Sequence, residues 1–74
     1  MSAQEFITEF KDTLGTSMRI DDQTALSDIP EWDSLTMMSV VTLLASQFGT
    51  FVTIADLKSC VKVSDIIAKI GGAL

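Results

Sequence analysis

The chain of 74 residues contains no histidine and only one cysteine, Cys60. A single cysteine excludes an internal disulfide, and the missing histidines remove the usual ligands of a structural zinc site. Histidine is also the usual general base near neutral pH, so hydrolase triads and Cys–His nucleophile pairs are unavailable. We therefore expect a protein that is not an enzyme and that has no metal site.

Long apolar runs are also missing. No run approaches the roughly 18 residues that a membrane span requires, and residues 1–5 lack the basic and apolar parts of a signal peptide. Hydrophobic residues still make up 47% of the chain, which is enough to form a core and argues against disorder. We expect a single small domain over residues 1–74 that is soluble, cytoplasmic and monomeric, with no membrane insertion.

Positive charge is absent from the middle of the chain. No Lys or Arg occurs between Ile20 and Leu57, whereas 6 of the 10 acids lie there, and the net charge is −5. The negative electrostatic field of these acids repels nucleic acid and anionic membranes, so we expect protein partners and no nucleic acid. Repulsion among these acids predicts that added salt or a divalent cation raises the melting temperature. The simpler interpretation is that the acids keep a small apolar domain soluble.

Apolar residues recur at steps of three and four over residues 3–14, 34–48 and 63–70, which predicts three amphipathic helices. A short further helix is expected after Thr53, because Thr53 and Asp56 have the spacing of a capping box. The fold class that follows is all-α, a four-helix bundle with a long first loop and a short third helix. The residues expected to form or contact its core are Phe6, Ile7, Phe10, Leu14, Met18, Ile20, Leu26, Ile29, Met37, Val40, Val41, Leu44, Phe48, Phe51, Val52, Ile54, Leu57, Val63, Ile66, Ile67 and Ile70.

The helix ends carry recognisable signals. Ser2 and Glu5 have the spacing of a capping box for the first helix. Gly15 and Gly49 are suitable C-terminal stops for the first two helices. Lys62 stands at the start of the last helix, where Ser or Thr would be a better cap.

The long connection over residues 16–33 is rich in Asp, Ser and Thr and ends at Asp33-Ser34-Leu35. A loop of this length in a compact domain tends to be functional. Ser34 then lies at a helix N-terminus, where an attached anion is favoured by roughly 0.3–1 kcal/mol. Repulsion from Asp33 and Glu31 opposes that effect. The alternative is that Ser34 is an ordinary helix cap, or simply follows an Asp33 cap.

With 33 residues before Ser34 and 40 after it, the chain resembles the acyl carrier proteins over nearly its whole length. The resemblance rests on Glu31-Trp32-Asp33-Ser34-Leu35 and on the helices placed around it. It implies the acyl carrier type of bundle, with 4′-phosphopantetheine attached to Ser34 and with Asp33 and Leu35 completing the motif. The arm's thiol would carry acyl groups as thioesters in fatty-acid, polyketide or other specialised biosynthesis. The implied partners are a phosphopantetheinyl transferase and the acyl-loading and acyl-accepting enzymes.

The second helix departs from this pattern. Typical fatty-acid carriers have many acids in the helix after the serine, whereas this helix has none after Asp33. The residues at such positions here are Thr36, Ser39, Ala45, Ser46 and Gln47. We infer a dedicated set of partners that contact apolar and hydroxyl side chains. The candidate contacts are Leu35, Met38, Thr42 and Leu43, with Leu43 expected on the polar side of the helix, where it is otherwise an isolated exposed leucine.

Three other residue types invite interpretation. Trp32 is expected to brace the loop against the second helix, with contact to the arm as the alternative. Met18, Met37 and Met38 either line an adaptable interior that admits an acyl chain or serve as ordinary core. Cys60 is expected in or near the core.

Two other functions remain open. A peptidyl or aminoacyl carrier would use Ser34 identically and differ only in its load. An unmodified structural interaction module would keep the helical bundle without the arm.

Overall fold

The computed structural model describes residues 3–71. Within that range it contains four α-helices, one short 3₁₀ turn and no β-strand, so the all-α prediction is confirmed as a small helical bundle. The elements are α1 (Ala3–Leu14), η1 (Leu26–Asp28), α2 (Ser34–Gln47), α3 (Ile54–Lys58) and α4 (Val63–Ile70). No helix in the described part of the chain is long and apolar enough to cross a membrane.

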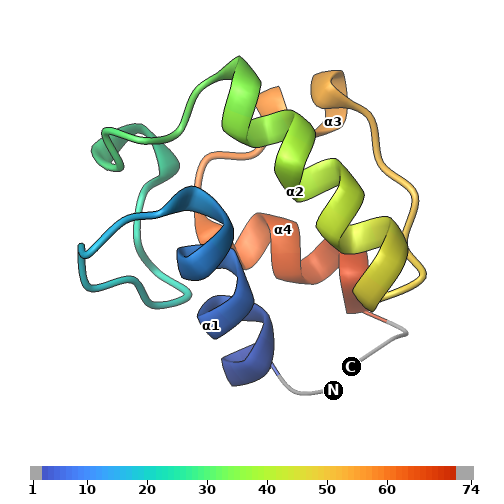
Figure 1. The fold of residues 1–74 in the computed structure, drawn as a ribbon, viewed down its shortest axis with the longest axis horizontal. Helices are drawn as coiled ribbons and strands as arrows, with labels where there is room; N and C mark the ends of the chain where they lie inside the picture. The colour runs from blue at the N-terminus through green and yellow to red at the C-terminus, as the bar shows by residue number, and fades with distance from the viewer. Residues whose placement is uncertain (1–2, 72–74) are drawn as a thin grey trace.

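α2 is the central helix of the bundle. It runs diagonally across the front of the view in Figure 1, with α1 below it, α3 beside its upper part and α4 behind it. α2 packs against both α1 and α3. Because α2 has neighbours on two sides, a large part of its circumference is buried, and its N-terminus remains at the edge of the bundle.

A single hydrophobic cluster holds the helices together. Its buried members are Phe6, Ile7, Phe10, Leu14, Ile20, Leu26, Ile29, Met37, Val40, Leu43, Leu44, Phe48, Leu57, Val63, Ile66 and Ile70. The ring of Phe6 stacks on Phe10 with centroids 5.4 Å apart and meets Phe48 edge-on at 5.6 Å. Such aromatic pairs contribute about 0.5–1.5 kcal/mol each beyond the area they bury. The Phe6–Phe48 pair joins α1 to the end of α2, and the Phe6–Phe10 pair lies within α1.

Three apolar residues differ in burial from what their sequence positions predict. Leu43 was expected on the polar side of α2 but is only 8% exposed. α2 has neighbours on more than one side, so more than one stripe of the helix can be buried. Phe51 was expected to support α3 but is 86% exposed. It lies in the connection before α3, and Leu57 fills the core from that helix instead. Val41, placed in the core stripe by its spacing, is only partly buried.

The predicted stops of α1 and α2 are confirmed. Gly15 and Gly49 have φ values of 68° and 62°, in the left-handed region that a residue with a Cβ adopts only at a cost. After Gly49, the Thr50 N–H donates to the Leu44 carbonyl at 2.9 Å and closes the end of α2. The predicted cap at Ser2 lies outside the described residues.

The two short C-terminal helices have well-formed N-terminal caps. Thr53 and Asp56 form the predicted capping box: the Thr53 hydroxyl accepts from the Asp56 N–H at 3.1 Å, and the Asp56 carboxylate accepts from the Thr53 N–H at 2.8 Å. Lys62 is the N-cap of α4 and gives no side-chain cap. Asp65 compensates by accepting from the N–H groups of Val61 at 2.9 Å and Lys62 at 3.0 Å.

The long loop before α2 is held in place by apolar side chains in the core and by backbone hydrogen bonds to another segment. Ile20, Leu26 and Ile29 are buried, and Met18 packs partly against the core, as predicted. The loop also pairs with the segment that leads into α4 through three backbone hydrogen bonds of 2.8–3.1 Å, which are Leu26 N–H to Val61 O, Val63 N–H to Thr24 O and Ser64 N–H to Asp22 O. The chain therefore approaches Ser34 along a defined path.

Candidate functional site

Ser34 is the first residue of α2 and is exposed. The N-cap is Asp33, whose side chain accepts a hydrogen bond from the Thr36 N–H at 3.0 Å. Of the two cap assignments left open by the sequence, the structure therefore has Asp33 as the cap. The Ser34 hydroxyl makes no hydrogen bond with any residue in the range 3–71, so it is available at the surface.

Thr36 completes the cap, and sequence reasoning missed this role. Its Oγ1 accepts from the Asp33 N–H at 3.0 Å, so Asp33 and Thr36 form a reciprocal capping box around Ser34. Thr36 Oγ1 also lies 2.7 Å from the Glu31 carbonyl oxygen, to which it donates. The signal was present in the sequence, because Asp and Thr stand three residues apart just before an apolar run.

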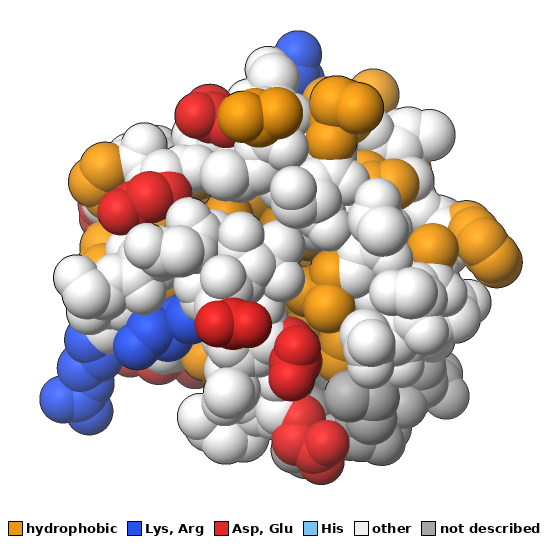
Figure 2. All heavy atoms as spheres, in the orientation of Figure 1, with side chains coloured by type: hydrophobic (Ala, Val, Ile, Leu, Met, Phe, Trp, Pro, Cys, Tyr) orange, Lys and Arg blue, Asp and Glu red, His pale blue; other side chains and the backbone are white. Residues whose placement is uncertain are grey.

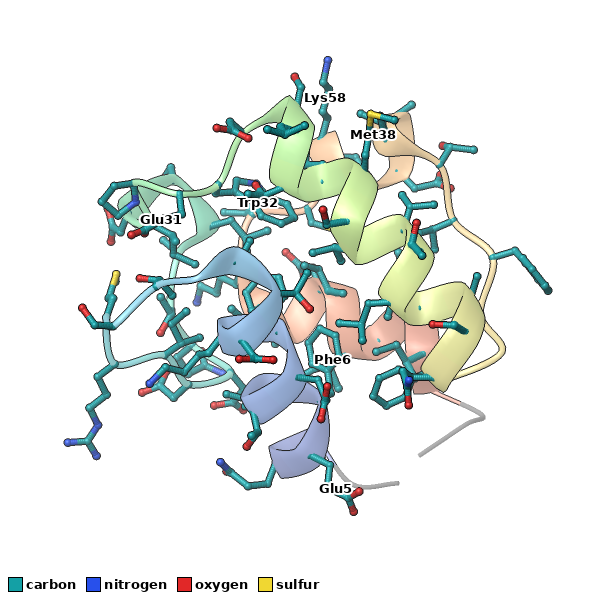
Figure 3. All side chains as sticks on the ribbon, viewed as in Figure 1. Glu5, Phe6, Glu31, Trp32, Met38 and Lys58 are labelled. Carbon is teal, nitrogen blue, oxygen red and sulfur yellow. The ribbon has the colours of Figure 1, made fainter. Side chains whose placement is uncertain are left out.

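Trp32 links the segment before Ser34 to α1. Its ring centroid lies 5.7 Å from that of Phe10, with the planes tilted by 53°. Figure 3 shows Trp32 between the loop and the body of the bundle. Trp32 therefore contacts the body of the bundle, but its ring contact is with α1, whereas bracing against α2 was expected.

The start of α2 presents an uncharged surface. Leu35 is 74% exposed and Met38 is 57% exposed, and Thr42 is also exposed. Ser34, Met38 and Thr42 follow one another at intervals of four residues, so they lie in one row along the helix, about 6 Å apart in rise. We call Leu35, Met38 and Thr42 the α2 face. Leu43 does not belong to it because that side chain is buried.

A shallow groove of about 210 Å³ lies between the α2 face and α3, lined by Met38, Val41, Thr42 and Ile54. Figure 2 shows apolar side chains gathered along the upper edge of the molecule, and Figure 3 places Met38 there, with Lys58 of α3 at the same end. The groove begins one helical turn from Ser34.

The three methionines do not line a common interior. Met37 is buried in the core, Met18 packs against the core from the loop, and Met38 is at the surface. Of the two interpretations left open by the sequence, ordinary core packing fits Met37 and Met18, and only Met38 borders the groove. The physical reason is that Met37 and Met38 are neighbours in a helix, which directs their side chains about 100° apart.

A wider depression of about 680 Å³ lies over α1 and the residues that follow it. Its lining includes acids and bases, among them Glu9, Asp12, Lys11 and Arg19. None of the predicted site residues borders it. The groove beside α2 is therefore the depression that belongs to the candidate site.

Cys60 is partly buried against the core, as expected, and its Sγ lies 3.4 Å from the Asp56 carbonyl oxygen, to which it donates. Burial raises the pKa of this thiol, and the negative charges of Asp65 and Asp56 act in the same direction against the opposing effect of Lys69. The thiol form therefore dominates near neutral pH, which makes Cys60 a poor nucleophile.

The acids of the loop are not gathered into a cation site. Between residues 3 and 71, no group of three or more His, Cys, Asp or Glu side chains has an arrangement that could hold a metal ion. Asp21 instead orders its own turn, because its Oδ1 accepts from the Gln23 N–H at 2.9 Å.

Comparison of the chain with family models, with curated proteins and with solved structures finds no match in any of the three. The interpretation of the site therefore depends on its own geometry and chemistry.

Proposed function

We propose that this protein is a carrier of the acyl carrier type, with a 4′-phosphopantetheine arm on Ser34. The observation that supports the proposal is the exposed Ser34 hydroxyl, which has no hydrogen bond within the described chain and stands at the first position of α2. A serine that served only as a cap would use its oxygen on the helix. Here Asp33 and Thr36 perform that task and leave Ser34 available.

In the modification, the Ser34 oxygen attacks the phosphorus of coenzyme A that carries the pantetheine arm and forms a phosphodiester. The pyrophosphate P–O bond breaks and adenosine 3′,5′-bisphosphate leaves, while the serine proton passes to the base of the modifying enzyme. This chain supplies no histidine, so the transferase provides the base and the metal. The product anion lies at the N-terminus of α2, where the helix dipole stabilises it by about 0.3–1 kcal/mol. The negative charges of Asp33 and Glu31 oppose this stabilisation.

The arm ends in a thiol that holds acyl groups as thioesters. The groove beside Met38, Thr42 and Ile54 offers an apolar surface for the first carbons of such a group, and each buried CH₂ is worth about 0.8 kcal/mol. The groove is shallow and small, which favours transient shelter over full enclosure. The load is thereby kept close to the protein and still available to the next enzyme.

The α2 face is the surface proposed to contact partners, namely a phosphopantetheinyl transferase and the acyl-loading and acyl-accepting enzymes. α2 carries no charged residue from Ser34 to Gln47. Its exposed residues offer apolar contact through Leu35 and Met38 and hydrogen bonding through Thr42. Partners that use this face need a complementary apolar surface more than a basic one.

The test is direct. Purified chain is incubated with coenzyme A and a promiscuous phosphopantetheinyl transferase, and its intact mass is measured. We expect the mass to rise by one arm. Ser34→Ala should abolish the gain, and Ser39→Ala, an exposed serine further along α2, should retain it.

If a control carrier is modified under the same conditions and this chain is not, the carrier proposal is wrong. The unmodified interaction module then becomes the better account. Gain of an arm leaves the acyl and the aminoacyl or peptidyl carrier as alternatives. Loading assays with acyl and aminoacyl donors separate those two.

A further inference from the structure

Thr36 occupies an unusual position beside the proposed attachment site. One hydroxyl group contacts two residues of the chain before α2: it donates to Glu31 O at 2.7 Å, accepts from Asp33 N–H at 3.0 Å, and lies 3.3 Å from Asp33 Oδ1. The backbone N–H of Thr36 donates to the same Asp33 carboxylate at 3.0 Å. A single side chain thus joins the end of the loop to the first turn of the helix.

Ser34 has no comparable connection of its own. Its side chain makes no hydrogen bond within residues 3–71, so the direction of its Cα–Cβ bond depends entirely on the backbone on either side. Asp33 on one side has the extended conformation, with φ −145° and ψ −177°, and Thr36 holds that residue from the other side. The backbone that sets the direction of the Ser34 side chain is therefore held by contacts that Thr36 makes.

We propose that Thr36 is a positioning residue for the modification of Ser34, an inference that rests on the proposed carrier function. Thr36 does not touch the reacting atoms. It keeps the last loop residues and the first helical turn in one geometry, so that the Ser34 oxygen meets the reacting phosphorus at a fixed angle. Loss of alignment at a reacting centre costs up to on the order of 100-fold in rate for a displacement of about 1 Å.

The bond to Glu31 distinguishes this role from simple helix capping. A cap requires only the exchange between Asp33 and Thr36. The additional bond to Glu31 O extends the restraint two residues back into the loop, where Trp32 contacts Phe10 of α1. The backbone around Ser34 is thereby fixed relative to the body of the bundle as well as to its own helix.

The experiment measures kcat and KM of the transferase for three variants at a temperature where each remains folded by circular dichroism. Thr36→Val keeps the shape of the side chain and removes the hydroxyl. Thr36→Ser keeps the hydroxyl and serves as the rescue. Asp65→Ala removes the carboxylate that caps α4 and serves as a control for destabilisation by loss of a cap away from Ser34.

We expect Thr36→Val to lower kcat about tenfold or more, with a smaller change in KM because the α2 face remains in place. Thr36→Ser should restore most of kcat, and Asp65→Ala should leave kcat near that of the wild type. Wild-type kcat for Thr36→Val, or an equal loss for Asp65→Ala, would overturn the positioning role alone. A wild-type chain that takes no arm would refute the carrier function, and the positioning role would fall with it.

Discussion

Leu35 and Leu43 belong to the same helix and are 74% and 8% exposed, respectively. The first lies beside Ser34 on the α2 face, and the second is part of the core. At the scale of single residues, Leu35 is therefore expected to serve partner contact, and Leu43 to serve the stability of the fold.

Truncation of the two leucines to alanine should affect different quantities, the stability of the fold in one case and the binding of partners in the other. Leu43→Ala leaves a cavity in the core and should lower the free energy of unfolding by about 2–5 kcal/mol. Leu35→Ala should change it by no more than about 0.5 kcal/mol and should raise the KM of the transferase. Urea denaturation followed through Trp32, the single tryptophan, measures the first effect. Equal stability losses for the two variants would contradict the assignment of Leu35 to the surface.

At the scale of elements, α3 and α4 depend on carboxylates at their N-termini. Backbone hydrogen bonding from Thr53 lowers the pKa of Asp56. Hydrogen bonds from the Lys62 and Val61 N–H groups likewise lower the pKa of Asp65. α3 has only five residues, too few to be stable in isolation, so its cap and its contact with the core maintain it.

These shifts predict the direction of the acid response. In the unfolded chain an Asp titrates near pH 3.9, and in the folded chain both groups titrate below that value. Between the two values the unfolded chain binds more protons than the folded chain. The stability that these two carboxylates contribute is therefore fully present above about pH 4 and is lost as the pH falls through their folded pKa values. Asp56→Asn and Asp65→Asn should each flatten the fall in melting temperature below about pH 4. An unchanged slope in both variants would show that other groups control acid unfolding.

At the scale of the whole molecule, the relevant quantity is the net charge of −5 spread over a small surface. The described acids do not form a metal site, and Asp21 and Asp22 have their own roles in the loop backbone. We therefore expect cations to act on this fold mainly by general screening of the repulsion between acids.

We expect added salt to raise the melting temperature by a few degrees. NaCl and MgCl₂ should act equally at equal ionic strength, since both only shorten the screening length. Calorimetric or spectroscopic melting curves in the two salts test this. A larger effect of Mg²⁺ at low millimolar concentration would reveal a cation site, and no effect of either salt would mean that repulsion contributes little to stability.

Local signals determine much of this protein directly from its sequence. Helix periodicity, the Thr53–Asp56 box and the two stop glycines predict the helices to within about one residue, because caps and left-handed glycines act over only a few positions. The exposed position of Ser34 at the start of a helix follows from the same signals. Its modification remains a prediction.

Tertiary packing alone decided the rest. The spacing of apolar residues gives the direction of a helix face but not the number of helices that flank it, so the burial of Leu43 was decided by how α2 is enclosed in the bundle. The exposure of Phe51 and the contact of Trp32 with α1 likewise depend on where distant segments meet. The bond from Thr36 to Glu31 O depends on the path of the loop, which residues 16–33 adopt only when they are pinned to the core and to the segment before α4.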